Sequence, residues 1–317
     1  MQVRDYVTSS SEQVKSGFKN FITDFTQLVK LRLTLTVVLS ASIAFLLGAK
    51  QQGSIDWINW FFLVIGGFFV TGSANGFNEI IEKDSDKLMK RTAQRPLPAN
   101  RMTTGQALVI SLFLGISGTL ILSHLNFVAG IISVFSLILY AFVYTPLKSK
   151  SPIAVWVGAL PGALPPLIGY FAAFSQDNLA LYSQYNERAI ILIPAVLFFI
   201  QFLWQFPHFW AIAWVADEDY KKAGIRLLPT KKKDTVSAVM LFISCVIMVP
   251  AGFLPLHYGF GGIYFVVITT LLGIAFSWLG YKHLIKKDTQ TAKKVMFMSI
   301  IYLPVSQLAL LFDFIAL

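Results

Sequence analysis

Three side chains with oxygen donors follow one another at helical spacing where a long apolar run meets a charged stretch. Asn78, Glu82 and Asp86 occupy positions i, i+4 and i+8, so they share one face if the helix continues through them. A column of oxygen donors without histidine or cysteine suits a hard cation, above all Mg²⁺, which binds few carboxylates together with waters and substrate phosphates. The alternative is a solvated loop with surface ion pairs.

Basic side chains come directly after this column. Arg91 and Arg95 precede Pro96, which turns the chain. Arginine binds phosphate with two parallel hydrogen bonds. The combination therefore indicates a site for a phosphate-bearing substrate.

A second group of charges ends another long apolar run. Asp217, Glu218 and Asp219 are followed by Tyr220 and Lys221. Two acidic clusters facing each other across a helical bundle suit the metal-assisted departure of a diphosphate, because the metal neutralises the leaving group and basic side chains hold the remaining oxygens.

The elements that must position these clusters are membrane helices. Of the 317 residues, 56% are hydrophobic and only 13% are charged, whereas a soluble protein carries about 25% charged residues. Apolar runs of about 20 residues span a bilayer, and the expected fold is an all-α polytopic bundle of nine transmembrane helices. The predicted spans are 31–49, 57–77, 105–125, 127–147, 153–174, 189–215, 236–254, 261–281 and 295–315.

The basic residues lie almost entirely on one side of these spans. With a cytoplasmic N-terminus, the inner segments hold 24 of the 26 Lys and Arg residues, which is the positive-inside pattern. The sequence therefore predicts an N-in, C-out topology, and the net charge of +10 requires no nucleic acid as a partner. The inner segments are 1–32, 78–104, 148–152, 216–235 and 282–294.

Residues 1–30 are expected to form a cytoplasmic segment that precedes a single transmembrane domain over 31–317. Apolar side chains recur in it at helical spacing, which predicts an amphipathic helix on the membrane surface. These side chains are Phe18, Phe21, Ile22, Phe25 and Val29.

Three stretches, in order, resemble the UbiA superfamily of intramembrane prenyltransferases and, within it, the protohaem IX farnesyltransferase family. The first, 78–97, contains Asp-x-x-Met-x-Arg-Thr-x-x-Arg-Pro; the second, 144–170, contains Tyr-Thr-Pro-Leu-Lys and a Gly/Pro-rich run; the third, 204–229, begins Trp-Gln-Phe-Pro-His. The resemblance implies a nine-helix bundle, Mg²⁺ as cofactor, and an active site that faces the cytoplasm of a bacterial inner membrane.

The resemblance also implies the reaction. Farnesyl diphosphate would give its farnesyl group to a vinyl group of haem b, with addition of water, to form haem O. Membrane lipid surrounds such an enzyme, and the expected protein partners are haem A synthase or oxidase assembly proteins.

The resemblance assigns roles residue by residue. The implied metal ligands are Asn78, Glu82, Asp86 and Asp219. The implied substrate-binding residues are Arg91, Arg95, Tyr144, Lys148 and Lys221. The implied catalytic residues are Asp86, Asp219 and Tyr220. Ala216 and Tyr220 stand where other superfamily members have the two aspartates of the second motif, which leaves the number of Mg²⁺ ions open.

His208 lies after Pro207 inside an aromatic span. Polar groups inside a membrane are costly, and they often have a function. We expect a catalytic role, as a contact to haem or as a base for the water step, with its ring among Trp204, Phe206 and Trp210. The alternative is a hydrogen bond across helices.

Pro161, Pro165 and Pro166 interrupt the fifth span. Broken helices at membrane depth line cavities or pack against protein, so the sequence allows either a cavity for a planar macrocycle or a kink in a packed helix.

Two other functions are compatible with parts of the pattern. A quinone-precursor aromatic is the alternative acceptor within the superfamily. A transporter is the alternative of another class, but it predicts inverted repeats and charges near the bilayer midplane, whereas the acidic clusters lie at one face.

Overall fold

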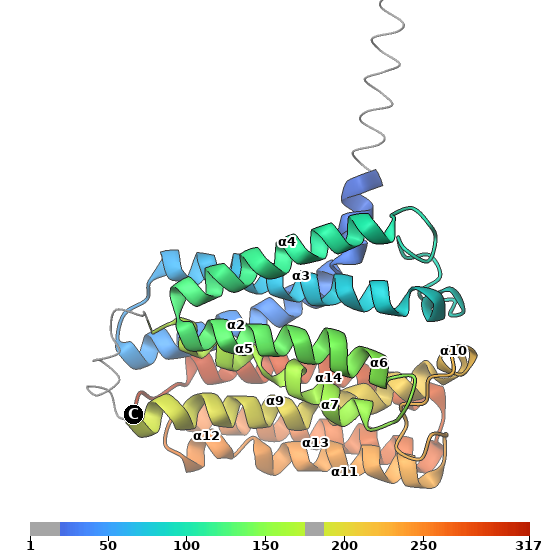
Figure 1. The fold of residues 1–317 in the computed structure, drawn as a ribbon. Helices are drawn as coiled ribbons and strands as arrows, with labels where there is room; N and C mark the ends of the chain where they lie inside the picture. The colour runs from blue at the N-terminus through green and yellow to red at the C-terminus, as the bar shows by residue number, and fades with distance from the viewer. Residues whose placement is uncertain (1–19, 175–186) are drawn as a thin grey trace, which may run out of the picture.

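The computed structural model describes residues 20–174 and 187–317. Within these residues, nine helical segments are long and apolar enough to cross a membrane, in agreement with the nine predicted spans (Figure 1). The elements are α2 (Leu31–Gln52), α3 (Trp57–Lys87), α4 (Thr104–Leu125), α5 (Phe127–Ile138), the π-helix η1 (Leu139–Tyr144), α6 (Thr145–Leu147), α7 (Ala154–Ala163), α8 (Pro165–Ala172), α9 (Glu187–Val215), α10 (Asp217–Lys222), α11 (Thr235–Ala251), α12 (Leu254–His257), α13 (Ile263–Lys286) and α14 (Thr289–Phe312).

The helix starts follow local capping chemistry. Asp56 accepts hydrogen bonds from the backbone of Ile58 and Asn59 at the start of α3 (2.9 and 3.0 Å), and Thr103 forms a capping box with Gln106 at α4. Such caps satisfy backbone N–H groups that have no partner inside the helix.

Three helices depart from their predicted bounds at the charged end of the bundle. The second span continues as α3 to Lys87, well beyond the predicted end at residue 77, which confirms the helical register assumed for the oxygen column. Helices also extend into the inner segment 282–294, since α13 runs to Lys286 and α14 begins at Thr289. Asp288 caps α14 by accepting the backbone N–H of Thr291 at 2.7 Å, and lysine is a good helix former.

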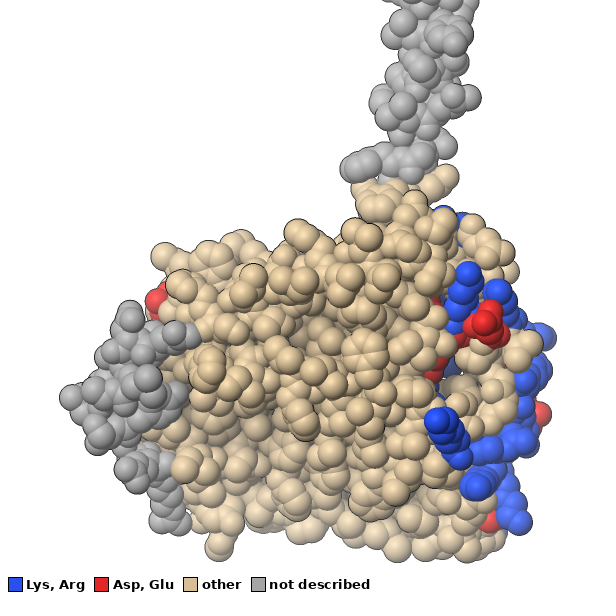
Figure 2. All heavy atoms as spheres, in the orientation of Figure 1, with Lys and Arg blue, Asp and Glu red and all other residues tan. Residues whose placement is uncertain are grey.

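The helices form one closed bundle. Helices adjacent in sequence contact each other, and α14 contacts α2 to complete the ring, while α8 packs against α2. The C-terminal end of α3, with the loop after it, lies at the same end of the bundle as α6 and α10 (Figure 1). Lys and Arg side chains gather at this end, whereas the flanks are almost free of charge (Figure 2). The fold therefore brings both charged clusters to one end.

A helix covers residues 20–28 before α2. Phe21 is exposed and Leu28 is fully buried, as an amphipathic helix requires, whereas Phe18 lies outside the described residues. Its location on a membrane surface, and the domain boundary at residue 30, stay predictions.

The proline-rich span is broken, as predicted. Pro161 lies inside α7, and Pro165 starts α8 after the break. A Cβ atom on Gly158 would lie 2.6 Å from the Tyr144 ring, and one on Gly169 would lie 1.9 Å from the backbone oxygen of Ala41. These close approaches support the packing alternative for this span.

A buried polar network ties four helices together inside the apolar bundle. Gln201 of α9 accepts hydrogen bonds from Ser40 (2.8 Å) and Gln307 (2.9 Å). Its amide nitrogen donates to the backbone oxygen of Gly162 (2.8 Å). Because no water competes inside a membrane, such groups need protein partners.

We expect Gln201→Leu to lower the free energy of unfolding by about 1–3 kcal/mol, because it leaves buried donors and acceptors unpaired. Reversible unfolding in mixed detergent micelles measures the change. The matched control is Gln290→Leu, at an exposed position in α14, which should change stability by less than about 0.5 kcal/mol. Equal losses in the two variants would contradict a stabilising role for the network.

Candidate active site

The oxygen column forms on α3 as its spacing predicts. The side chains of Asn78, Glu82 and Asp86 are all buried (1%, 8% and 1% exposed). Burial of two carboxylates is costly unless each finds a partner. The column therefore requires compensating groups from other parts of the chain.

Each member of the column has a basic partner from a different element. Lys30 Nζ donates to Asn78 Oδ1 at 2.5 Å. Lys148 Nζ lies 2.5 Å from Glu82 Oε1, and Arg95 Nη1 lies 2.6 Å from Asp86 Oδ2. We call these three contacts the paired column. They are found in place of the solvated surface ion pairs that the alternative interpretation expects.

Lys30 reaches the column from an unusual backbone position. It caps α2 in the left-handed region, with φ of 48°, and such non-glycine residues are enriched at functional sites. Burial, together with nearby Arg95, lowers the pKa of Lys30 to about 7. No role for Lys30 follows from the sequence, because its partner Asn78 is 48 residues away.

Lys148 follows the short helix α6. Burial alone would lower its pKa, but the Glu82 carboxylate outweighs this effect, so that the pKa of Lys148 is raised. Its ammonium also lies over the Tyr144 ring, 5.3 Å from the centroid. Tyr144, a predicted substrate-binding residue, therefore lies beside the paired column.

The π-helix η1 sets the orientation of Asn78. Thr145, the residue after η1, donates its hydroxyl to the backbone oxygen of Tyr140 (2.9 Å) and so accepts the Asn78 amide N–H (3.0 Å). This leaves Asn78 Oδ1 facing Lys30. Single π-helical turns are frequent at functional sites.

The loop after α3 holds Arg95 against Asp86. Thr92 donates its hydroxyl to the backbone oxygen of Asp86 (2.9 Å), and Glu79 accepts the backbone N–H of Leu97 (3.2 Å). Glu79 is fully buried. No role for Glu79 follows from the sequence alone; the signal that could reveal it is an acid at the apolar end of a span.

A further ion pair fastens this loop to the N-terminal helix. Arg101 Nε lies 2.8 Å from Asp24 Oδ1, and Arg101 also donates to the backbone oxygen of Gln94 (3.0 Å). The loop is thereby held from both sides.

The second cluster meets the first through Arg91. Its guanidinium lies over the Tyr220 ring, 5.5 Å from the centroid. Lys222 and the backbone N–H groups of Arg91 and Lys90 lower the pKa of Asp219, and Lys222 Nζ lies 3.1 Å from its Oδ1. The two motifs are therefore in contact, as the sequence predicts.

The other predicted members of the second cluster have separate partners. No hydrogen bond or ion pair joins Asp219 to the column among the residues that the structure describes. Lys221 Nζ lies 2.7 Å from Oδ2 of the buried Asp217. The metal role of Asp219 and the substrate role of Lys221 stay predictions.

His208 has a different environment from the predicted one. Its Nδ1 hydrogen-bonds Ser299 Oγ of α14 (2.8 Å), and its ring stacks on Trp204 with centroids 4.6 Å apart. Phe206 and Trp210 instead pack against Trp156, so the prediction of His208 among these two rings is wrong. Residues spaced by two along a helix point to different sides. The hydrogen bond across helices is present, and the ring is only partly buried.

The chemistry of the donors in the column fits Mg²⁺. Each ion pair engages one carboxylate oxygen, Glu82 Oε1 or Asp86 Oδ2, so the second oxygen lies outside the pair. Within the described residues, no three His, Cys, Asp or Glu side chains form a metal-binding group. Mg²⁺ commonly binds only one or two carboxylates together with waters and substrate phosphates.

Comparisons with known proteins point to one family. A profile of the UbiA prenyltransferase family matches residues 37–301. A relative named protoheme IX farnesyltransferase from Cytophaga hutchinsonii is 47% identical over 293 residues, which cover 90% of this chain and 96% of the relative.

Two solved structures share the fold. That of digeranylgeranylglyceryl phosphate synthase has a TM-score of 0.73 at 20% identity and covers 92% of this chain and 98% of its own. A UbiA homologue from Archaeoglobus fulgidus, bound to GPP and Mg²⁺, has a TM-score of 0.62 at 13% identity, covering 91% and 99%.

We expect Lys148→Met to lower the free energy of unfolding by about 3–5 kcal/mol, because it leaves the Glu82 charge buried and unpaired. The double variant Lys148→Met/Glu82→Gln should recover more than half of the loss. Unfolding in mixed micelles measures both.

The control for this test is a pair on the same helix. Lys87 and Asp84 lie 3.2 Å apart but are 43% and 92% exposed, so Lys87→Met should cost less than about 1 kcal/mol. A similar cost for Lys87→Met and Lys148→Met would refute the buried pairing.

Proposed function

Because the chain belongs to the UbiA prenyltransferase family, and within it to the protohaem IX farnesyltransferases, we propose that it transfers the farnesyl group of farnesyl diphosphate to a vinyl group of haem b. The allylic C–O bond breaks and its electron pair leaves with the diphosphate. The vinyl carbon forms the new C–C bond, and water adds to the resulting cation with loss of a proton. The products are haem O and diphosphate.

The paired column is the observation that carries this proposal. Lys30, Arg95 and Lys148 meet at a buried face of oxygen donors. Their donors can reach phosphate oxygens while the carboxylates beside them balance the charge of the free site. Arg91 and Tyr144 extend the same surface toward the second motif.

Asn78, Glu82 and Asp86 would hold Mg²⁺, with Asp219 facing them from the second motif. The ion, when bound, supplies positive charge to the departing diphosphate. The homologue from Archaeoglobus fulgidus, bound to GPP and Mg²⁺, supports this assignment. Asp86 has a further task, since it orients the Arg95 guanidinium.

The roles in the second motif follow from its contacts. Tyr220 supports the Arg91 guanidinium with its ring, and Asp219 lies near the backbone N–H groups of residues 90–91, which lower its pKa. Lys221 lies one residue further along α10 and is partly exposed, where it can meet the outer phosphate.

His208 is the candidate for contact with haem. Ser299 engages Nδ1, so Nε2 is the nitrogen that can meet haem or the attacking water. Trp204 donates its own ring N–H to the backbone oxygen of Ser299 (2.8 Å) and so fixes the stacked pair.

The protein is a multi-pass membrane protein, and its proposed location is a bacterial inner membrane. The basic residues lie at the same end as the site, and the positive-inside pattern then gives an N-in, C-out topology with a site that faces the cytoplasm. Haem A synthase or oxidase assembly proteins would receive the product.

The two alternatives gain no support. The relative from Cytophaga hutchinsonii carries the name of a haem-modifying enzyme, which disfavours a quinone-precursor acceptor. The charged groups gather at one end of the bundle, whereas a transporter requires them near the midplane.

The experiment that tests the function supplies membranes containing this protein with haem b, farnesyl diphosphate and Mg²⁺. Mass spectrometry should find a haem that has gained one farnesyl and one hydroxyl group. Prenylation of 4-hydroxybenzoate, with haem unchanged, would overturn the proposal in favour of the quinone-precursor alternative.

We expect Asp86→Asn to lower turnover at least about 100-fold, because it removes a charge that both Mg²⁺ and Arg95 need. Glu82→Asp keeps a carboxylate in the same register and should retain most activity. The matched control is Asp84→Asn, since Asp84 is 92% exposed; it should turn over normally. Near-normal turnover of Asp86→Asn would show that the metal assignment is wrong.

We expect His208→Ala to raise the KM for haem about tenfold while leaving the KM for farnesyl diphosphate nearly unchanged, because one lost hydrogen bond costs about 1.5 kcal/mol. Steady-state kinetics with each substrate varied in turn measures both constants. Ser299→Ala removes only the partner of Nδ1 and should have a smaller effect. Equal losses for both substrates would show that His208 is structural.

A further inference from the structure

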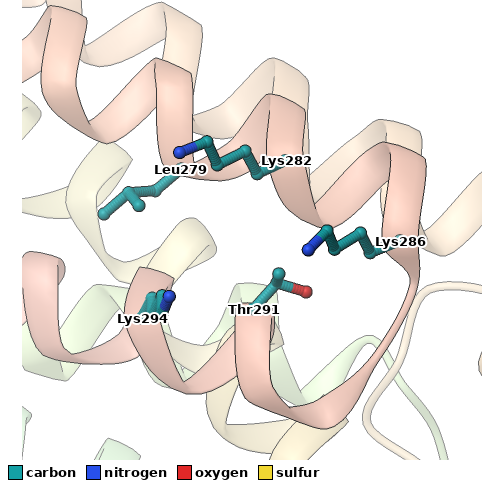
Figure 3. A pocket seen from close by; sticks show the side chains of 5 residues that line it. All are labelled: Leu279, Lys282, Lys286, Thr291 and Lys294. Carbon is teal, nitrogen blue, oxygen red and sulfur yellow. The ribbon is translucent and has the colours of Figure 1, made fainter.

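A small cavity opens between the inner ends of α13 and α14, neither of which carries a member of the paired column. Its volume is about 150 Å³. Figure 3 shows three lysine side chains from the two helices around this opening. The lining residues are Leu279, Lys282, Lys286, Thr291 and Lys294.

No ion pair holds the lysine side chains of this cavity. Among the described residues, no acidic side chain forms an ion pair with Lys282, Lys286 or Lys294. Asp288 lies near, but its carboxylate accepts the backbone N–H and the hydroxyl of Thr291 (2.7 and 2.8 Å). Three lysines around one opening favour an anion as occupant.

The surface beside the cavity indicates to which kind of molecule the anionic group belongs. Lys282 Nζ lies over the Trp278 ring, 4.9 Å from its centroid, and Trp278 stacks on Tyr281 with centroids 5.8 Å apart. These rings are 54% and 44% exposed. Exposed tryptophan and tyrosine at the end of a membrane helix mark the level of the lipid headgroups.

An apolar strip continues from this aromatic pair along α13. Leu271, Ile274 and Trp278 lie at helical spacing on the face of Lys282, and all three are exposed (63%, 56% and 54%). The cavity is therefore continuous with a surface that suits an acyl chain.

We propose that this cavity binds the phosphate headgroup of an anionic phospholipid, with one acyl chain along α13. A soluble phosphate shares the headgroup chemistry, but the aromatic pair of Trp278 and Tyr281 places the cavity at the level where phospholipid phosphates are concentrated. This location favours the lipid. Basic pockets between membrane helices bind phosphate headgroups in this way. This site adds a bound lipid to the protein and is independent of the reaction proposed above.

The test measures lipid binding to the purified, delipidated full chain by native mass spectrometry. Phosphatidylglycerol should bind at least tenfold more tightly than phosphatidylcholine. The triple variant Lys282→Gln/Lys286→Gln/Lys294→Gln should lose roughly tenfold to hundredfold in affinity for phosphatidylglycerol, since each surface lysine contributes about 1 kcal/mol. If the triple variant does not fold, Lys294→Gln alone, at an exposed position, should lose roughly fivefold.

A matched variant removes the same charge from other exposed or half-buried positions at this end: Lys83→Gln/Lys232→Gln/Lys293→Gln. Its affinity for phosphatidylglycerol should stay within twofold of the parent. Equal losses in the two triple variants would overturn the proposal, because net charge alone would then explain binding. Displacement of the lipid by glycerol phosphate at equal concentration would overturn the lipid assignment in favour of a soluble anion.

Discussion

The pairing of three buried, oxygen-bearing side chains with three basic side chains organises one end of this molecule. Asn78, Glu82 and Asp86 can be buried on α3 only because basic side chains from three other segments meet them. A buried carboxylate without such a partner costs several kcal/mol. These contacts consequently fix three segments relative to one another: the entry to α2, the loop after α3 and the turn after η1. A diphosphate would bind to this fixed arrangement.

Unusual local features of the fold position the residues of this arrangement. Lys30 holds a left-handed backbone conformation, and η1 adds a π-helical turn where the chain approaches the column. Gly158 leaves room for the Tyr144 ring. Features of this kind are costly and persist where the surrounding structure demands them. The middle of the bundle is held by apolar packing and by the Gln201 network, which reaches the break between α7 and α8 at Gly162.

The sequence is sufficient for the spans and for the column, because both depend on local periodicity. Apolar runs mark nine helices, and an i, i+4, i+8 spacing needs only a continuing helix to be realised. The partners of these side chains cannot be predicted from local periodicity, because Lys30 and Asn78 are 48 residues apart in the sequence and His208 and Ser299 are 91 residues apart. The resemblance implies Asp219 as a ligand, whereas the structure pairs it with Lys222. The helices extend into the charged inner segment 282–294, because hydropathy marks the apolar part of a helix and not its charged ends.

The paired column is proposed as a joint site for Mg²⁺ and diphosphate. Calorimetric titration of inorganic diphosphate into the purified protein, with and without Mg²⁺, tests this proposal. Mg²⁺ should strengthen diphosphate binding at least about tenfold, since the ion would neutralise the phosphate oxygens together with Lys30, Arg95 and Lys148. Diphosphate binding that is absent, or that is equally strong without Mg²⁺, would contradict it.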